Sequence, residues 1–166
     1  VMSSLWSSKV SFPNGLLHLD GIPATDLARD FGTPAFFLDE SDFRNRAASW
    51  RTSLDESFGL NAGSVYYAGK AFLCVEVAKW VEQSGIGLDV CTGGELAVAL
   101  AANFPMQKIQ VHGNNKSVAE IDRALEVGVG TIVIDSLFEI ERIATAAKKY
   151  GKRQAVLLRL TPGIEA

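Results

Sequence analysis

The sequence has few of the features that mark secreted, membrane-spanning or metal-stapled proteins. Its two cysteines, Cys74 and Cys91, are too few for a disulfide framework and too far apart for a redox pair or a zinc site. No run of about 18 apolar residues could span a membrane, and residues 1–8 lack the basic start and apolar stretch of a signal peptide. We therefore expect a reducing, cytoplasmic setting with both cysteines as structural thiols.

Clustered positive charge is also missing. Lys and Arg number 16 against 19 Asp and Glu, a formal net charge of −3. Binding to nucleic-acid phosphates or to anionic membranes depends on clustered Lys and Arg, so we expect neither as a partner. The chain does have 48% hydrophobic residues over 166 positions, enough for the core of one globular domain.

Residues 64–166 repeat one unit, a β-rich run followed by a helical pattern. The runs begin 22 to 24 positions apart, and apolar residues at three- and four-residue spacing fill the segments between them. The runs begin at Val65, Gly87, Ile109, Thr131 and Ala155, and the expected helices cover residues 72–82, 95–102, 118–126 and 137–150. This alternation predicts a parallel α/β sheet, and its period favours a (β/α)8 barrel over an open doubly wound sheet. Eight units need roughly 200 residues or more, so five predict an open sheet or part of a larger barrel.

Helix-start and helix-end residues support this division. A hydroxyl residue stands three positions before a Glu at three junctions, which predicts three capping boxes. The pairs are Thr92 with Glu95, Ser117 with Glu120, and Ser136 with Glu139. Gly85, Gly128, Gly130 and Gly151 follow the helices and are expected to close them in the left-handed conformation. We expect Gly94 to lie in a tight turn with positive φ, where a β-branched residue would be strained.

The first 60 residues differ in character. The alternating run 16–20 predicts a short strand within residues 10–19, followed by a turn at 20–23. From Asp39 a helix is expected, with Phe43, Ala47, Trp50 and Leu54 on one packing face.

Each predicted strand of the repeat ends on an ionisable residue. These are Lys70, Asp89, His112, Asp135 and Arg159. Ligands of parallel α/β folds bind beyond the carboxyl ends of the strands, so five such residues predict a site, although any one of them could be solvated. Lys70 lies between Gly69 and Ala71, and a partly desolvated lysine there could attack a carbonyl carbon. His112 could instead bond only to neighbouring backbone.

Four motifs carry a family resemblance. Tyr67-Ala-Gly-Lys70-Ala resembles the Tyr-Ala-x-Lys-Ala signature of the fold-type III decarboxylases, which use pyridoxal 5'-phosphate (PLP). The later strand ends resemble the diaminopimelate decarboxylase branch of that family, in order from residue 32 to residue 163. They are Asp89-Val-Cys-Thr-Gly-Gly-Glu-Leu, His112-Gly-Asn-Asn-Lys-Ser and Val133-Ile-Asp-Ser136.

The resemblance implies a fold and a set of site residues. It implies a PLP-binding (β/α)8 TIM-type barrel, of which this chain holds about five strand–helix units plus an N-terminal strand and helix. Residues 1–35 would be an entry segment and strand shared with a C-terminal β domain, and residues 36–166 the first part of the barrel. Lys70 matches the lysine that carries PLP, while Asp89, His112 and Arg159 match cofactor-facing positions. The family works as a homodimer with the active site at the subunit interface.

The implied activity is that of a carboxy-lyase of lysine biosynthesis. It would decarboxylate meso-2,6-diaminopimelate to L-lysine and carbon dioxide, with the PLP ring accepting the electron pair. The family's glycine-rich phosphate loop, its acidic partner of the pyridine nitrogen and its catalytic cysteine belong to later parts of the pattern. Neither Cys74 nor Cys91 matches that cysteine. We therefore expect the 166 residues alone to hold PLP poorly and to turn over little or nothing.

Three alternatives stay open at this point. Another fold-type III enzyme, such as an ornithine or arginine decarboxylase or an alanine racemase, would share the barrel and Lys70. A non-catalytic PLP-binding protein would also keep both. A metal- or phosphate-dependent barrel would need a cluster of His and carboxylate ligands, for which only His112 with Asp89 or Asp135 is available.

Overall fold

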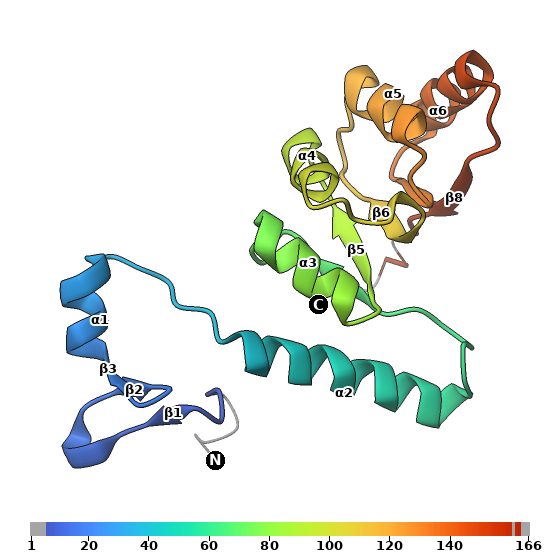
Figure 1. Cartoon of the computed structure of the whole chain (residues 1–166). Helices are drawn as coiled ribbons and strands as arrows, with labels where there is room; N and C mark the ends of the chain where they lie inside the picture. Colours follow the sequence, from blue (N-terminus) through green and yellow to red (C-terminus); the bar gives the residue numbers. More distant parts are fainter. Residues whose placement is uncertain (1–5, 161, 164–166) are drawn as a thin grey trace. The chain divides into compact units, whose positions relative to one another are not determined.

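The computed structural model describes residues 6–160 and 162–163, and the chain divides into two compact units. The first covers residues 1–49 and the second covers residues 50–166 (Figure 1). No helix among the described residues is both long enough and apolar enough to cross a lipid bilayer.

In its described part, the first unit contains a small antiparallel sheet followed by a short α-helix. Its strands are β1 (Val10–Ser11), β2 (His18–Leu19) and β3 (Ile22–Pro23), in the order β1-β2-β3. A 3-10 helix, Pro13–Gly15, separates β1 from β2, and α1 (Ala24–Phe31) follows β3. Three short strands therefore stand where the sequence predicted one strand and a turn. The turn between β2 and β3 has two successive residues at positive φ, Asp20 and Gly21, as tight hairpins require.

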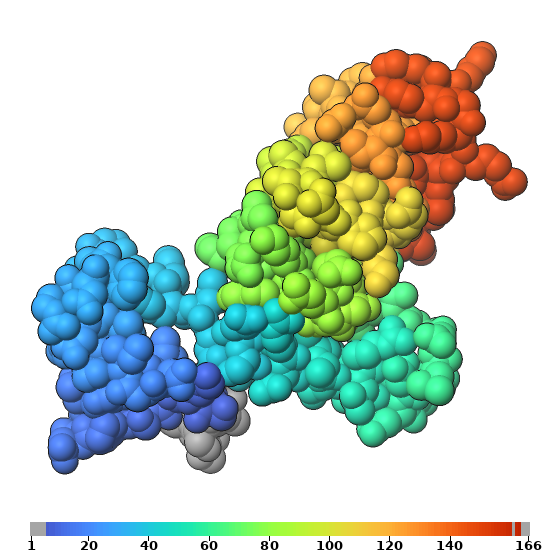
Figure 2. Space-filling model, viewed as in Figure 1, coloured from blue at the N-terminus to red at the C-terminus, as the bar shows by residue number. Residues whose placement is uncertain are grey.

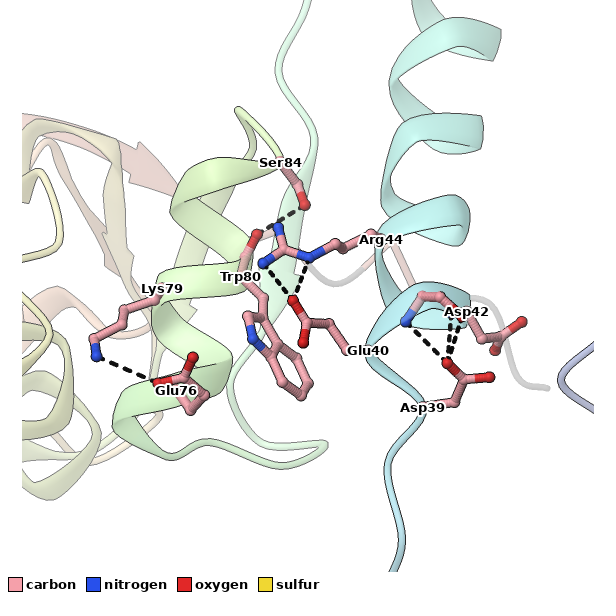
Figure 3. A network of polar contacts seen from close by, with 9 residues as sticks. Asp39, Glu40, Asp42, Arg44, Glu76, Lys79, Trp80 and Ser84 are labelled. Carbon is pink, nitrogen blue, oxygen red and sulfur yellow. Dashed lines mark hydrogen bonds and ion pairs between the residues drawn. The ribbon is translucent and has the colours of Figure 1, made fainter. Parts of the chain in front are cut away.

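Helix α2 (Glu40–Phe58) begins where the acidic residues predicted a helix start. Asp39 caps it, because its Oδ1 accepts hydrogen bonds from the backbone N–H groups of Ser41 at 2.9 Å and Asp42 at 3.2 Å (Figure 3). Hydrogen bonds from the hydroxyls of Ser41 and Ser7, together with these weaker backbone contributions, lower the pKa of Asp39 to about 2. The expected packing face is wrong in part, since Trp50 is 70% exposed although Ala47 is buried.

The second unit is a five-stranded parallel sheet with a helix after each of its first four strands. The strands, in spatial order, are β4 (Tyr66–Ala68), β5 (Gly87–Val90), β6 (Ile109–Val111), β7 (Thr131–Ile134) and β8 (Ala155–Leu158). The helices are α3 (Val75–Gln83), α4 (Gly93–Ala101), α5 (Val118–Val127) and α6 (Leu137–Tyr150), with a 3-10 helix at Met106–Lys108. The strands lie side by side in the same order as in the chain, as they do in a (β/α)8 barrel. The predicted α/β fold is therefore confirmed.

The two faces of this sheet differ. Paired residues of parallel strands point to the same side, and successive residues alternate. The row Leu88, Ile109 and the row Val90, Val111, Ile132 face the helices and are buried; we call this side the helix face. The row Ala68, Asp89, Gln110, Thr131 and Ala155 lies on the other side, the open face, and none of its members is buried.

The helices close the helix face by packing in chain order. Helix α3 contacts α4, α4 contacts α5, and α5 contacts α6. The space-filling view shows them as a continuous surface, from green at α3 to red beyond α6 (Figure 2). Ion pairs between residues three apart lie on the exposed side of these helices. One example joins Lys79 and Glu76 of α3 at 3.3 Å (Figure 3). The core of the unit is therefore one apolar layer between sheet and helices.

The three predicted capping boxes differ in the structure. Ser117 and Glu120 form the full box at the start of α5. Thr92 caps α4 by accepting from the backbone N–H of Glu95, but the Glu95 side chain bonds elsewhere. The Ser136 side chain makes no cap hydrogen bond.

The glycine predictions also divide. Gly128 and Gly151 close α5 and α6 in the left-handed conformation as predicted. Gly94 lies inside α4 without positive φ, so the expected strain there is wrong. Gly130 is needed for a different reason than predicted, because a Cβ there would stand 2.1 Å from the carbonyl oxygen of Gln107.

Candidate functional site

Lys70 lies in a tight turn directly after β4. The backbone N–H of Ala71 donates to the carbonyl of Ala68 at 3.0 Å and closes the turn, while the Tyr67 hydroxyl donates to the carbonyl of Phe72 at 2.7 Å. A glycine is required at position 69 because β5 lies against it. A Cβ there would stand 2.8 Å from the carbonyl oxygen of Asp89. The turn therefore presents the exposed Lys70 side chain at the carboxyl end of the sheet.

Asp89 and His112 meet on the open face. Asp89 is on β5, and His112 directly follows β6, where its backbone N–H donates to the carbonyl of Val90 at 2.7 Å. Their side chains approach to 3.5 Å, between His112 Nε2 and Asp89 Oδ2. Burial raises the pKa of the Asp89 carboxyl, and the neighbouring charges of His112 and Lys70 oppose that rise. Among the described residues, the buried Oδ1 of Asp89 has no hydrogen-bond partner.

Cys91 and Gln110 lie near this group, although the sequence patterns assigned neither of them to the site. Burial raises the pKa of the Cys91 thiol, and the neighbouring Lys70 amine opposes that rise. The Gln110 Oε1 stands 3.4 Å from His112 Nε2. A signal for both was present in the sequence, because residues two apart on a strand share a face: Cys91 follows Asp89 by two, and Gln110 precedes His112 by two. We call Lys70, Asp89, Cys91, Gln110 and His112 the amine cluster.

The remaining two predicted residues form a separate pair. Arg159 Nη1 donates to Asp135 Oδ1 at 3.2 Å, between the ends of β8 and β7. The backbone supports the pair, since the Arg159 N–H donates to the carbonyl of Ile134 at 3.0 Å. The structure thus brings the five predicted strand-end residues to one edge of the sheet in two groups. Among the described residues, no three His, Cys, Asp or Glu side chains gather as they would around a metal ion.

The amine cluster has the chemistry to hold an aldehyde. A primary amine can condense with a carbonyl group, and a nearby carboxylate with a free oxygen can accept a hydrogen bond or balance a positive charge. Asp89 meets the second condition through its unpartnered Oδ1. On the other face of the same strand as Asp89, Leu88 and Val90 are fully buried.

Residues 40–166 match the family described as "Pyridoxal-dependent decarboxylase, pyridoxal binding domain". This match covers three quarters of the chain and includes every member of the amine cluster.

Curated relatives point to one branch of this family. The chain is 53% identical over 152 residues to the diaminopimelate decarboxylase of Mycobacterium bovis, which covers 92% of this chain and 33% of that protein. It is 48% identical over 165 residues to the enzyme of the same name from Mycobacterium leprae, which covers 99% of this chain and 34% of that protein. The chain therefore spans about a third of the length of the curated relatives that it matches.

A solved structure shows the same fold. The diaminopimelate decarboxylase of M. jannaschi superposes with a TM-score of 0.82 at 30% sequence identity, covering 95% of this chain and 37% of that one. The predicted resemblance to the diaminopimelate decarboxylase branch is confirmed by these matches.

Proposed function

Since the chain belongs to the pyridoxal-dependent decarboxylase family and carries its pyridoxal-binding domain, we propose that the amine cluster holds PLP in an enzyme that decarboxylates meso-2,6-diaminopimelate to L-lysine. The observation that carries the proposal is the exposed Lys70 amine beside the half-buried Asp89, whose Oδ1 has no partner among the described residues. The substrate is taken from the relatives, which are named diaminopimelate decarboxylases.

The residues present fit the aldehyde end of PLP. Lys70 would carry the cofactor covalently, and Asp89 and His112 would face it from the neighbouring strands. When bound, PLP supplies an electron sink for the pair left behind as carbon dioxide departs. Arg159 would also bind the cofactor. Its hydrogen bond to Asp135 holds the guanidinium at the carboxyl end of the sheet.

The chain's own residues prepare the amine for this role. The turn Ala68–Ala71 holds the backbone of Lys70, and the Lys70 amine is near enough to Cys91 to lower the pKa of its thiol against the larger effect of burial. The protonated form of Asp89 is favoured by burial, while His112 and Lys70 favour its ionised form. The pKa of Asp89 is therefore raised, but by less than burial alone would raise it.

The domain arrangement belongs to the same proposal. Residues 1–35 would serve as an entry segment shared with a C-terminal β domain, and residues 36–166 as the first part of the barrel. The enzyme would act in the cytoplasm as a homodimer with its active site at the subunit interface, as the family resemblance implies.

Product analysis tests the proposal. The purified protein, in its native length and with PLP added, is incubated with meso-diaminopimelate, L-ornithine, L-arginine or L-alanine, and the products are separated by chromatography. L-lysine formed from meso-diaminopimelate alone is the expected result. Amines from ornithine or arginine, or D-alanine, would assign the chain to another enzyme of this fold, and PLP binding without any product would indicate a non-catalytic protein.

A further inference from the structure

A buried ion pair lies next to the two groups of site residues. Lys116 is in the loop before α5, and Glu139 is in the first turn of α6. Both side chains are 2% exposed, and Lys116 Nζ stands 2.9 Å from Glu139 Oε2. Taking two charges out of water costs more than their pairing usually returns, and an apolar pair of similar volume often stabilises a fold equally well. Stability alone is therefore a poor explanation for these two residues.

The contacts of Lys116 connect two strand ends. Its ammonium donates to the carbonyl of Gly113 at 2.6 Å and to the carbonyl of Val133 at 2.7 Å, in addition to Glu139. An ammonium has three donors, so all of them are used. Gly113 directly follows His112, and Val133 is two residues before Asp135. One buried cation thus ties the loop of the amine cluster to the strand that carries the Asp135–Arg159 pair.

The contacts of Glu139 point the same way. Its Oε2 accepts a hydrogen bond from the backbone N–H of Asp135 at 2.9 Å as well as from Lys116. Asp135 in turn accepts the bond from Arg159. The carboxylate therefore holds the backbone of one site residue and the cation that holds the loop of another.

A comparison with β5 isolates what Lys116 adds. Glu95 stands four residues after Cys91 and accepts a hydrogen bond from its backbone N–H at 2.5 Å, with the same spacing as Glu139 and Asp135. A glutamate in the first helical turn thus closes the strand end at both places. At Glu139 a buried lysine also joins that strand end to its neighbour.

We propose that Lys116 and Glu139 are positioning residues that hold His112 against Asp89 and Asp135 against Arg159. The importance of this for catalysis rests on the proposed function. The backbone N–H of His112 donates a hydrogen bond to Val90 of the neighbouring strand. Lys116 donates to the carbonyl of Gly113, the next residue in the loop. Without Lys116, the loop loses its second anchor.

Four variants of the protein in its native length separate positioning from stability. Lys116→Met and Glu139→Leu each leave one charge buried, while the double variant Lys116→Met with Glu139→Leu replaces the pair by an apolar one. Lys116→Arg keeps the charge but cannot place a compact head group on the same three oxygens, and it guards against poor folding of the others. Each is measured by its Tm, by its kcat and KM for meso-diaminopimelate, and by the rate at which diethyl pyrocarbonate modifies His112 in cofactor-free protein.

The chain offers an internal control for the modification rate. Its other histidine, His18, lies in the first unit and should react at one rate in every variant. We expect both single apolar variants to lose Tm and the double variant to recover most of that loss. In the double variant and in Lys116→Arg, His112 should react at least about threefold faster relative to His18, and kcat should fall about tenfold with little change in KM.

A double variant that recovers its Tm and modifies His112 at the wild-type rate would overturn the proposal, because the pair would then be structural only. Unchanged His112 reactivity in Lys116→Arg would also count against it if the double variant does not fold. Failure of the proposed function is recognised separately, since the wild-type protein would then form no L-lysine while the reactivity of His112 still decides whether the pair positions it.

Discussion

The two faces of the parallel sheet are made by the same strands, yet they carry opposite kinds of residue. On β5, Leu88 and Val90 point to the helix face and are fully buried, while Asp89 points to the open face. The helix face is closed by packing and needs only apolar side chains of the right size. The open face holds an amine, a carboxyl group, a thiol and an imidazole, with the imidazole of His112 3.5 Å from the carboxyl group of Asp89. Alternation along a strand therefore lets stability and chemistry be changed independently.

The largest effect should come from the open face. Lys70→Ala removes the amine that would carry PLP, so we expect kcat to fall roughly 10³-fold or more, with no covalently held cofactor. Because Lys70 is exposed, the Tm should change little. The control is Lys79→Ala on α3, which removes an exposed lysine and should leave both kcat and cofactor content unchanged. Normal turnover by Lys70→Ala would contradict the assigned role.

The opposite separation is expected on the helix face. Leu88 is fully buried, so Leu88→Ala should lower the free energy of unfolding by about 2–5 kcal/mol. Leu137 is 82% exposed, and Leu137→Ala should change it by less than about 0.5 kcal/mol. Denaturant unfolding measures both. Equal losses for the two variants would mean that the core is not the layer between sheet and helices.

Asp89 allows a change on the open face that should cost function but not stability. Burial raises its pKa, so the native state holds the carboxyl proton to a higher pH than the unfolded chain does. The free energy of unfolding should therefore fall as the pH rises from about 4 through the raised pKa. Asp89→Asn removes this dependence, and at pH 7 its Tm should equal or exceed that of the wild type while its activity is lost.

Thermal unfolding between pH 4 and pH 7 checks this prediction. The difference in Tm between Asp89→Asn and the wild type should shrink toward pH 4, which is close to the ordinary carboxyl pKa, because below that pH the wild-type carboxyl is protonated in both states. The opposite result would be a Tm of Asp89→Asn that falls below the wild-type Tm at pH 7 but not at pH 4. It would show that the ionised Asp89 stabilises the fold through His112.

The smallest effect concerns two serines that look alike in the sequence. Ser117 makes a full capping box with Glu120, so Ser117→Ala should cost about 1 kcal/mol. The Ser136 side chain makes no cap hydrogen bond, so Ser136→Ala should be close to neutral. Equal losses in denaturant unfolding would show that the two helix starts are capped alike.

Sequence patterns predicted the layout of the second unit well because its signals are local. The 22-residue period, the apolar spacing of the helices and Gly128 and Gly151 each depend on a few neighbouring residues, and the structure confirms them. The strand ends followed from the same spacing, so Lys70, Asp89 and His112 could be named as neighbours in advance.

What the patterns missed depends on contacts between distant residues. Lys116 stands in a polar loop, and only the fold shows that it is buried against Glu139, 23 positions later. The sequence indicates a structural thiol at Cys91, and only the fold shows that Lys70, which follows the neighbouring strand, affects the pKa of this thiol. Glu139 and Ser136 have the spacing of a capping box, but the buried Lys116 and the N–H of Asp135 take the carboxylate instead. In the first unit the strands are too short to give a clear alternation.

The most direct test of the central claim is to locate the cofactor chemically. The purified protein, in its native length, is incubated with PLP, reduced with borohydride and digested, and the peptides are identified by mass spectrometry. The account predicts a pyridoxyl phosphate adduct on Lys70, with no comparable adduct on Lys79 or Lys116. An adduct spread over exposed lysines, or none at all, would contradict the claim that the open face of this sheet holds PLP.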